Sequence, residues 1–383
     1  MTKVKLDQVV NRIAGNVDYH DPQFTYYLGG EHYKSNSIEI VDRGVIKGTD
    51  LGPNYHYPFK KNDTIFMARN PHLHKAGRIA YDGVCSHASF VLRTKNETVL
   101  LSDFLPIIMQ SESLWDFFNE NKSGSVNSHC NWSSLKNFEF SLPDIDAQKQ
   151  YCHVIWTLQE YIVKTEEQLY LWDELVKSRF IEMFKPYFDL ERCVPLESLC
   201  NTFVDGDWIE SKDQDTSGIR LIQTGNVGIS TYLDKADKAR FINEETFERL
   251  NCTEVLPGDI LISRLPDPIA RSCIVPEGLG KSITGVDCTI VRFKDTVNPI
   301  FFNQYTLIDH YLSQISAFEA GSTRKRISRK NLGKIKVPLP SIDLQNQFAA
   351  FVEQVDKSKF ELQKHLEDTK KLQKALINQA FKQ

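Results

Sequence analysis

The 383-residue sequence lacks the features that mark secreted, membrane-bound or metal-binding proteins. Its first residues have no apolar core of the kind found in signal peptides, and no run of about 18 apolar residues predicts a membrane span. The eight cysteines are scattered without a C-x-x-C pair, so we expect reduced thiols, no metal site and a cytoplasmic location. With 41% hydrophobic and 25% charged residues, the composition is that of a soluble globular protein.

Catalytic motifs are missing as well. The stretch "VPEGLGKS" ends like a phosphate-binding loop, but Val275 stands where that motif needs its first glycine. The stretch "NPIF" at Asn298 lacks the second proline of the loop with which amino-methyltransferases hold a flipped base. There is no H-E-x-x-H, nucleophile elbow or acid–acid–lysine cluster. We therefore expect a non-catalytic binding protein that carries no cofactor of its own.

One segment of the chain occurs twice. The stretch "FEFSLPDIDAQKQY", which begins at Phe138, returns 197 residues later as "IKVPLPSIDLQNQF", which begins at Ile335, with no gap. A weaker echo relates "VKLDQVV" at Val4 to "VPLESLC" at Val194. A period of this length is too long for a solenoid and predicts two copies of a module with a globular head and a helix.

Each copy of this segment predicts a short strand, a proline and then a long helix. Asp144 or Ser341 can cap the helix, and an aspartate follows in the first turn, where the helix dipole favours an acid. Apolar residues then recur at spacings of three and four, as in a coiled-coil seam, with a few polar interruptions that can fix register. The seam and docking residues selected by this pattern are Ile155, Leu158, Ile162, Leu169, Trp172, Val352, Val355, Leu362, Leu366 and Leu376.

A helix of roughly 40 residues is about 60 Å long and cannot bury such a stripe alone. We therefore predict an α+β protein in which two heads are separated by an antiparallel two-helix coiled coil, with one head at each end and a pseudo-two-fold axis. The alternative is two unrelated helices, each packed on its own head. The predicted domains are a first head at 1–140, a helix at 141–185, a linker at 186–193, a second head at 194–337 and a C-terminal helix at 338–383.

Charge is unevenly distributed along the chain. The net charge of −4 argues weakly against a nucleic-acid partner, but basic residues gather in loops of both heads, and such loops suit a phosphate backbone. Arginine, asparagine and glutamine can in addition read base edges. The candidates for DNA contact are Lys60, Lys61, Arg69, Lys75 and Arg78 in the first head, and Gln223, Asn226, Arg264, Arg271, Arg324, Lys325, Arg326, Arg329 and Lys330 in the second.

Plainer interpretations of these residues remain open. The segment from Arg324 to Lys330 could be a solvated charged turn, and Gln223 and Asn226 could be amides that form a turn.

The repeated segment resembles the conserved regions of DNA specificity subunits of type I restriction–modification systems. The sequence "KIKVPLPSIDLQNQF" and the helix after it resemble the C-terminal conserved region, and residues 135–184 resemble the central one. The resemblance covers the whole chain. It implies two target recognition domains that read a bipartite, asymmetric double-stranded DNA site, and a coil that sets their spacing and docks two methyltransferase subunits. Restriction subunits would join through the methyltransferases, which would carry S-adenosylmethionine.

The first copy departs from the family pattern. Ser141 replaces the usual proline, and Cys152 and Trp156 are unusual, which leaves the docking geometry open. A second class of function is also compatible with the sequence, namely a non-enzymatic scaffold whose coil recruits partners and whose heads bind other proteins. A bipartite methylated DNA motif would separate the two.

Overall fold

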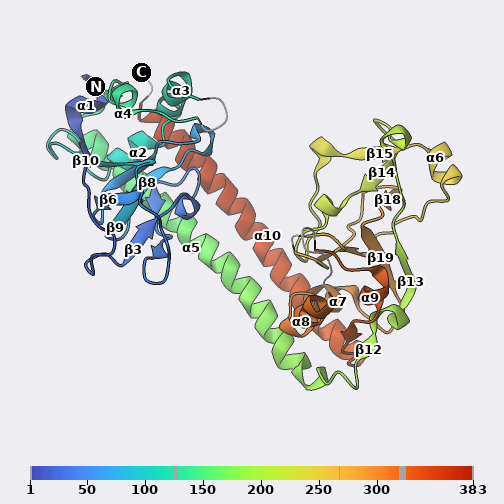
Figure 1. The fold of residues 1–383 in the computed structure, drawn as a ribbon. Coiled ribbons are helices and arrows are strands. Elements are labelled where there is room, and N and C mark those ends of the chain that lie inside the picture. The colour runs from blue at the N-terminus through green and yellow to red at the C-terminus, as the bar shows by residue number, and fades with distance from the viewer. Residues whose placement is uncertain (1, 125–127, 267, 319–324, 382–383) are drawn as a thin grey trace. The chain divides into compact units, whose positions relative to one another are not determined.

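The computed structural model describes residues 2–124, 128–266, 268–318 and 325–381, which form two compact units (Figure 1). Unit 1 contains Met1–Gln168 and Leu362–Gln383, and unit 2 contains Leu169–Glu361. Each unit combines a sheet-rich head with part of both long helices, so the chain is a mixed helix-and-sheet protein, as predicted. Within the described ranges, no helix is long and apolar enough to cross a membrane.

Within the described residues, the head of unit 1 contains a larger sheet, a smaller sheet, a two-stranded sheet of β1 and β11, and several short helices. The larger sheet has the order β2-β10-β7-β8-β4 and the smaller one β5-β3-β9-β6. The core packs around Phe66, Ile107 and Trp115, all essentially buried. The element bounds are β1 (Thr2–Lys5), α1 (Leu6–Val9), β2 (Val10–Ile13), β3 (Tyr26–Leu28), β4 (Glu39–Ile40), β5 (Gly44–Val45), β6 (Tyr55–Phe59), β7 (Thr64–Met67), β8 (Ala76–Ile79), β9 (Gly83–Ser86), β10 (Ser89–Thr94), α2 (Leu105–Met109), α3 (Glu112–Glu120), α4 (Trp132–Leu135) and β11 (Glu139–Leu142).

The head of unit 2 has a four-stranded sheet of order β13-β19-β16-β17 and a three-stranded sheet of order β15-β14-β18. Its core includes Phe301, Tyr305 and Tyr311. The element bounds are β12 (Val194–Pro195), β13 (Cys200–Asp205), β14 (Ile219–Ile222), β15 (Arg240–Ile242), α6 (Glu244–Arg249), β16 (Ile260–Ser263), β17 (Ser272–Ile274), β18 (Ser282–Thr284), β19 (Cys288–Phe293), α7 (Pro299–Tyr305), α8 (Asp309–Phe318), α9 (Arg329–Gly333) and β20 (Lys336–Val337).

The two heads share one plan of strand pairing. The order β2-β10-β7-β8 corresponds to β13-β19-β16-β17, and β5-β3-β9 corresponds to β15-β14-β18. The corresponding pairs β3–β9 and β14–β18 are both parallel. A two-point arginine–aspartate pair also recurs, between Arg93 and Asp63 at 2.7 and 2.8 Å and between Arg292 and Asp259 at 2.8 and 2.7 Å. The duplication therefore extends to the heads, where the sequence echo is faint.

The two long helices begin as the repeat predicts. Helix α5 spans Ile145–Phe184 and α10 spans Ile342–Gln379, with 40 and 38 residues. The Asp144 carboxylate accepts a hydrogen bond from the Ala147 amide at 2.9 Å, and the Ser341 hydroxyl accepts one from Leu344 at 3.4 Å. Both predicted caps are thus confirmed.

The repeated segment has a glutamine at the same position in both copies, Gln148 and Gln345, and both side chains are buried. In unit 1, Gln148 accepts from the Leu101 amide at 3.0 Å and donates to the carbonyls of Val99 and Pro143 at 2.9 and 2.8 Å. Its counterpart Gln345 is also fully buried and makes three equivalent bonds in unit 2. Each glutamine fastens a loop of its head to the first turn of the long helix.

Within each unit the two helices pack antiparallel, as predicted. In unit 1 the Gln373 amide donates to the Gln159 side chain at 3.1 Å and to the Ile155 carbonyl at 3.3 Å. In unit 2 Lys359 pairs with Asp173, and the Phe180 and Phe348 rings lie 5.2 Å apart. Gln373 and Lys359, two of the polar residues that interrupt the seam pattern, therefore bond across it.

Candidate nucleic-acid interface

One end of the larger sheet of unit 2 gathers the loops that carry the candidate residues. Strand β19 runs antiparallel to β13 and β16, with Asp205 opposite Thr289 and Ser263 opposite Cys288. The ends of β13 and β16 and the start of β19 therefore lie together. The loop after β14 joins them, because the Gly285 amide donates to the Ile222 carbonyl at 3.1 Å. We call this region the unit 2 sheet end.

The basic segment 325–330 is attached to the unit 2 sheet end. Arg329 Nε lies 3.9 Å from Asp205 Oδ2, and Arg326 Nη2 lies 3.9 Å from Asp287 Oδ1. The side chains of Arg326 and Arg329 are 55% and 45% exposed, so their guanidinium groups remain accessible. Lys325 and Lys330 are exposed on the same segment. The structure thus brings most of the predicted cluster together on one surface, while Arg324 lies outside the described residues.

Two other predicted arginines are used inside the head. Arg264 is only 5% exposed; its Nε lies 3.3 Å from Asp205 Oδ1, and its Nη2 donates to the Val286 carbonyl at 2.6 Å. Arg271 donates to the carbonyls of Thr224 and Val227 at 2.9 and 2.6 Å. Both side chains hold the loops of the sheet end in place, so their positions do not favour the predicted role as base readers.

The two predicted amides differ from each other. Asn226 is buried; its Oδ1 accepts from the Gln223 backbone amide at 3.0 Å and its Nδ2 donates to the Leu233 carbonyl at 2.9 Å. This is the turn-forming alternative. Gln223 is half-buried and its side chain lines a pocket at the sheet end. Of the two amides, Gln223 is the one placed where it can meet a ligand.

The basic residues predicted in unit 1 do not form one surface. Strands β7 and β8 are antiparallel with Thr64 opposite Arg78, so Lys60, Lys61 and Arg78 lie toward one end of the sheet. Arg69 and Lys75 lie toward the other end. Arg78 is half-buried, pairs with Glu39 and Asp103 at 3.3 and 2.7 Å, and stacks 3.7 Å above Trp156, and the Lys75 ammonium donates to the Gly30 carbonyl at 2.7 Å. The exposed candidates in unit 1 are Lys60, Lys61 and Arg69.

The equivalent end of the unit 1 sheet carries a different chemistry. The Cys130 amide donates to the Ala68 carbonyl at 2.9 Å, just as Ile327 donates to Arg264 at 3.3 Å in unit 2. The repeat therefore places His129 and Trp132 at the positions of Arg326 and Arg329. Arg69, which forms a bridge with His129, and Lys75 also lie at this end. Positive charge is therefore present at both ends but denser in unit 2, and the residues at equivalent positions differ.

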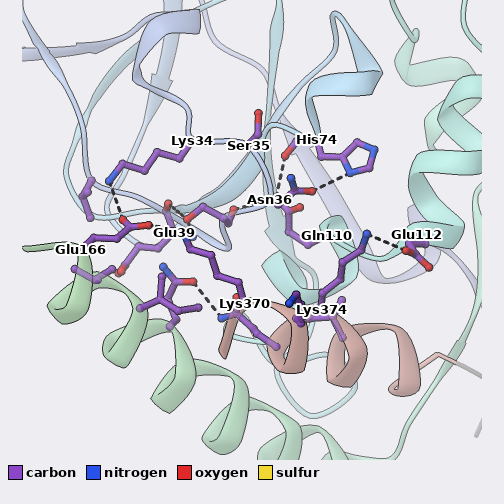
Figure 2. A pocket seen from close by; sticks show the side chains of 18 residues that line it. Lys34, Ser35, Asn36, Glu39, His74, Gln110, Glu112, Glu166, Lys370 and Lys374 are labelled. Carbon is purple, nitrogen blue, oxygen red and sulfur yellow. Dashed lines mark hydrogen bonds and ion pairs between the residues drawn. The ribbon is translucent and has the colours of Figure 1, made fainter. Parts of the chain in front are cut away.

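Unit 1 has a pocket of about 400 Å³ between its head and its helix pair, and Figure 2 shows its ion pairs. Lys34 and Lys370 lie 3.5 and 2.6 Å from the two carboxylate oxygens of Glu166, and Lys374 lies 3.1 Å from Glu112. Burial acts to raise the pKa of Glu166, but the lysine partners outweigh it and the pKa is lowered. Because local carboxylates neutralise these lysines, the pairs fasten the head to the helices rather than form an anion site.

Half of the predicted seam residues are buried, and several of these belong to the cores that the helices share with the heads. Ile155, Ile162, Val352 and Val355 are at most 5% exposed, and Leu366 is 8% exposed; Leu158, Leu169, Trp172, Leu362 and Leu376 are half-buried. These residues hold the helices together and present little surface to a partner. The seam pattern misses exposed apolar residues on the outer faces, among them Tyr170, Leu171, Leu175 and Phe360, which are 61%, 56%, 44% and 65% exposed.

The chain is similar to proteins of known class along nearly its whole length. A family model described as the type I restriction modification DNA specificity domain matches residues 2–170 and 194–370. A relative from Methanocaldococcus jannaschii, named as a putative type I restriction enzyme MjaX specificity subunit, is 21% identical over 368 residues, which are 91% of this chain and 84% of the relative.

Two solved structures share the fold. A chain from a structure of a type I R-M system, titled for its complex assembly and conformational transition, is 18% identical with a TM-score of 0.58, and the match covers 100% of this chain and 97% of that one. The S subunit of a type I restriction-modification system from M. genitalium is 14% identical with a TM-score of 0.51, over 100% and 96% of the two chains.

Proposed function

The chain belongs to the type I restriction modification DNA specificity family, and on that premise we propose that each of its units reads one half of a bipartite, asymmetric DNA sequence. The observation that carries the proposal is the unit 2 sheet end, where Arg326 and Arg329 stand exposed above loops that are themselves held rigid by Arg264 and Arg271. Exposed guanidinium groups on a fixed frame suit phosphate contacts, which set the position of a protein on a duplex.

The two heads differ in the residues that face this end, which fits an asymmetric target. Unit 2 has Arg326 and Arg329 where unit 1 has His129 and Trp132, with Arg69 beside His129. One head alone would bind weakly, and joining two in a single chain raises the effective concentration of the second for its half-site.

We further propose that the chain supplies recognition and no chemistry, and that methylation is performed by two methyltransferase subunits that carry S-adenosylmethionine. Restriction subunits would join through them. We assign to these partners the surface of the long helices that carries the exposed apolar side chains of Tyr170, Leu171 and Phe360. The similar solved chain that comes from an R-M assembly supports such partners.

The test is the salt dependence of DNA binding by the chain purified with its methyltransferase. Duplex affinity is measured against salt concentration for the unchanged chain, for Arg326→Ala and for Lys294→Ala. Lys294 is an exposed cation just beyond the other end of β19 and serves as the matched control. Losing one phosphate contact reduces the slope of log affinity against log salt by about 0.9.

We expect Arg326→Ala to weaken binding and to reduce this slope, and Lys294→Ala to change neither. Equal slopes for all three proteins would remove the unit 2 sheet end from the interface. If the chain bound no duplex in preference to random DNA, the proposed function would be wrong, and the alternative of a non-enzymatic protein scaffold would be favoured.

A further inference from the structure

A second pocket, of about 260 Å³, lies at the unit 2 sheet end beside the basic segment. Its walls come from loops and from strands β14 and β15, and the lining residues include Trp208, Gln223, Arg240 and Asp287. Asp287 also holds Arg326 at 3.9 Å, so the pocket borders the surface that we assign to the phosphate backbone. A volume below the roughly 300 Å³ of pockets for drug-sized ligands suits a single ring system.

Trp208 stands on an anchored loop but leaves most of its ring in water. The Gly206 amide donates to the Cys288 carbonyl at 2.9 Å, and the Asp207 amide donates to the Thr284 carbonyl at 2.8 Å. A Cβ at Gly206 would lie 2.3 Å from the Thr284 oxygen, so the close approach requires glycine. The indole is nevertheless 70% exposed, the highest value among the large apolar side chains in the described ranges. Such a ring is available to stack on another flat ring.

The charges in the pocket favour a nucleobase over a phosphate. Asp207 and Asp287 are among the residues that line it, and their negative charges repel an anion. The edge of a base, in contrast, carries N–H groups that can donate hydrogen bonds to carboxylates. It also carries acceptor atoms, to which the side chains of the lining residues Gln223 and Arg240 can donate. A base inside a duplex shows only its edge, so its face becomes available to Trp208 only after the base leaves the stack.

We propose that this pocket takes one nucleobase of the half-site read by unit 2 after that base has left the duplex stack, with Trp208 stacking on its face and Gln223 meeting its edge. The inference rests on the proposed function, because it assigns a place within the same DNA complex.

The test measures affinity for duplexes that carry the recognised site with one mismatched pair at each position in turn. A mismatch lowers the energy needed to extract a base. The unchanged chain with its methyltransferase should therefore bind more tightly, about tenfold or more, when the mismatch stands at one position of the unit 2 half other than the methylated base. A 2-aminopurine at that position should change its fluorescence on binding.

Trp208→Ala should abolish the preference for the mismatched duplex and lower DNA affinity about ten- to a hundredfold. Trp208→Phe keeps an aromatic ring and should retain most of the preference and of the affinity. Ile229→Ala is the control, since this residue of the same head is 59% exposed and lies outside the pocket lining.

The two proposals can fail separately. The base pocket would be overturned, and DNA reading left intact, if binding were sequence-specific but no mismatch were favoured and Trp208→Ala had the same duplex affinity as Ile229→Ala. If the unchanged chain showed no preference for any DNA sequence, both proposals would be overturned.

Discussion

Replacing Gln345 by leucine should destabilise unit 2 more than any nearby polar substitution on α10. The Gln345 side chain is fully buried, accepts from the Asn298 amide at 2.9 Å and donates to the carbonyls of Thr296 and Pro340 at 3.1 and 2.9 Å. Leucine has a similar size and a good helix propensity, so the substitution mainly removes these three bonds.

The size of the effect follows from what is left behind. Thr296 is exposed, so water can replace the lost donor there. The Asn298 amide is half-buried and Pro340 is buried, and both would lose their partner. At about 1–3 kcal/mol for each group left unsatisfied, Gln345→Leu should lower the free energy of unfolding by about 2–6 kcal/mol.

Urea denaturation monitored by circular dichroism measures this change, and amide hydrogen exchange at Asn298 reports it locally. Gln347→Leu is the matched control, because Gln347 lies two residues further along the same helix and is exposed. Gln148→Leu and Gln150→Leu repeat the comparison in unit 1, with Gln148 buried and Gln150 exposed. If Gln345→Leu were as stable as Gln347→Leu, the repeated glutamine would not be the fastening that its contacts indicate.

Three further changes test other parts of the structure by urea denaturation. Gln373→Leu should cost about 1–3 kcal/mol because it strands Gln159 in the helix seam, while the double variant Gln159→Leu/Gln373→Leu should recover most of that loss. Gly206→Ala should cost roughly 1–3 kcal/mol, since its Cβ would meet the Thr284 oxygen, and equal stability would contradict the close approach. Burial raises the pKa of Asp207, so the folded chain binds a proton on this carboxylate more tightly than the unfolded chain does. The free energy of unfolding should therefore fall as pH rises from the ordinary aspartate pKa through the raised one. Asp207→Asn should make that fall smaller.

The sequence predicted the helical frame well because its signals are local. Caps and apolar spacing act within a few residues, so the starts of α5 and α10 at Asp144 and Ser341 could be deduced from the residues beside them. The repeated glutamine was visible too, but its role was not. Its partners in unit 1, Val99 and Leu101, are 49 and 47 residues away, and no sequence pattern connects a buried amide to a loop so distant.

The site was harder to predict, because residue type does not reveal exposure. Arg264 and Arg326 are equally basic in the sequence, yet Arg264 is buried against Asp205 while Arg326 faces outward. Trp208 carries no periodic signal, and an isolated tryptophan is more often a core residue, so its exposed place beside the pocket could be found only from coordinates. In unit 1 the basic residues separate because Lys60 and Lys61 precede strand β7 while Arg69 follows it, at opposite ends of the sheet.

Methylome sequencing of cells that express the chain with its methyltransferase tests most directly whether the two units read two halves of one site. We predict a bipartite, asymmetric methylated motif, and we predict that Gln223→Ala relaxes one half of it while the other half stays unchanged. Absence of any motif, or a substitution in unit 2 that alters both halves together, would contradict independent reading by two heads.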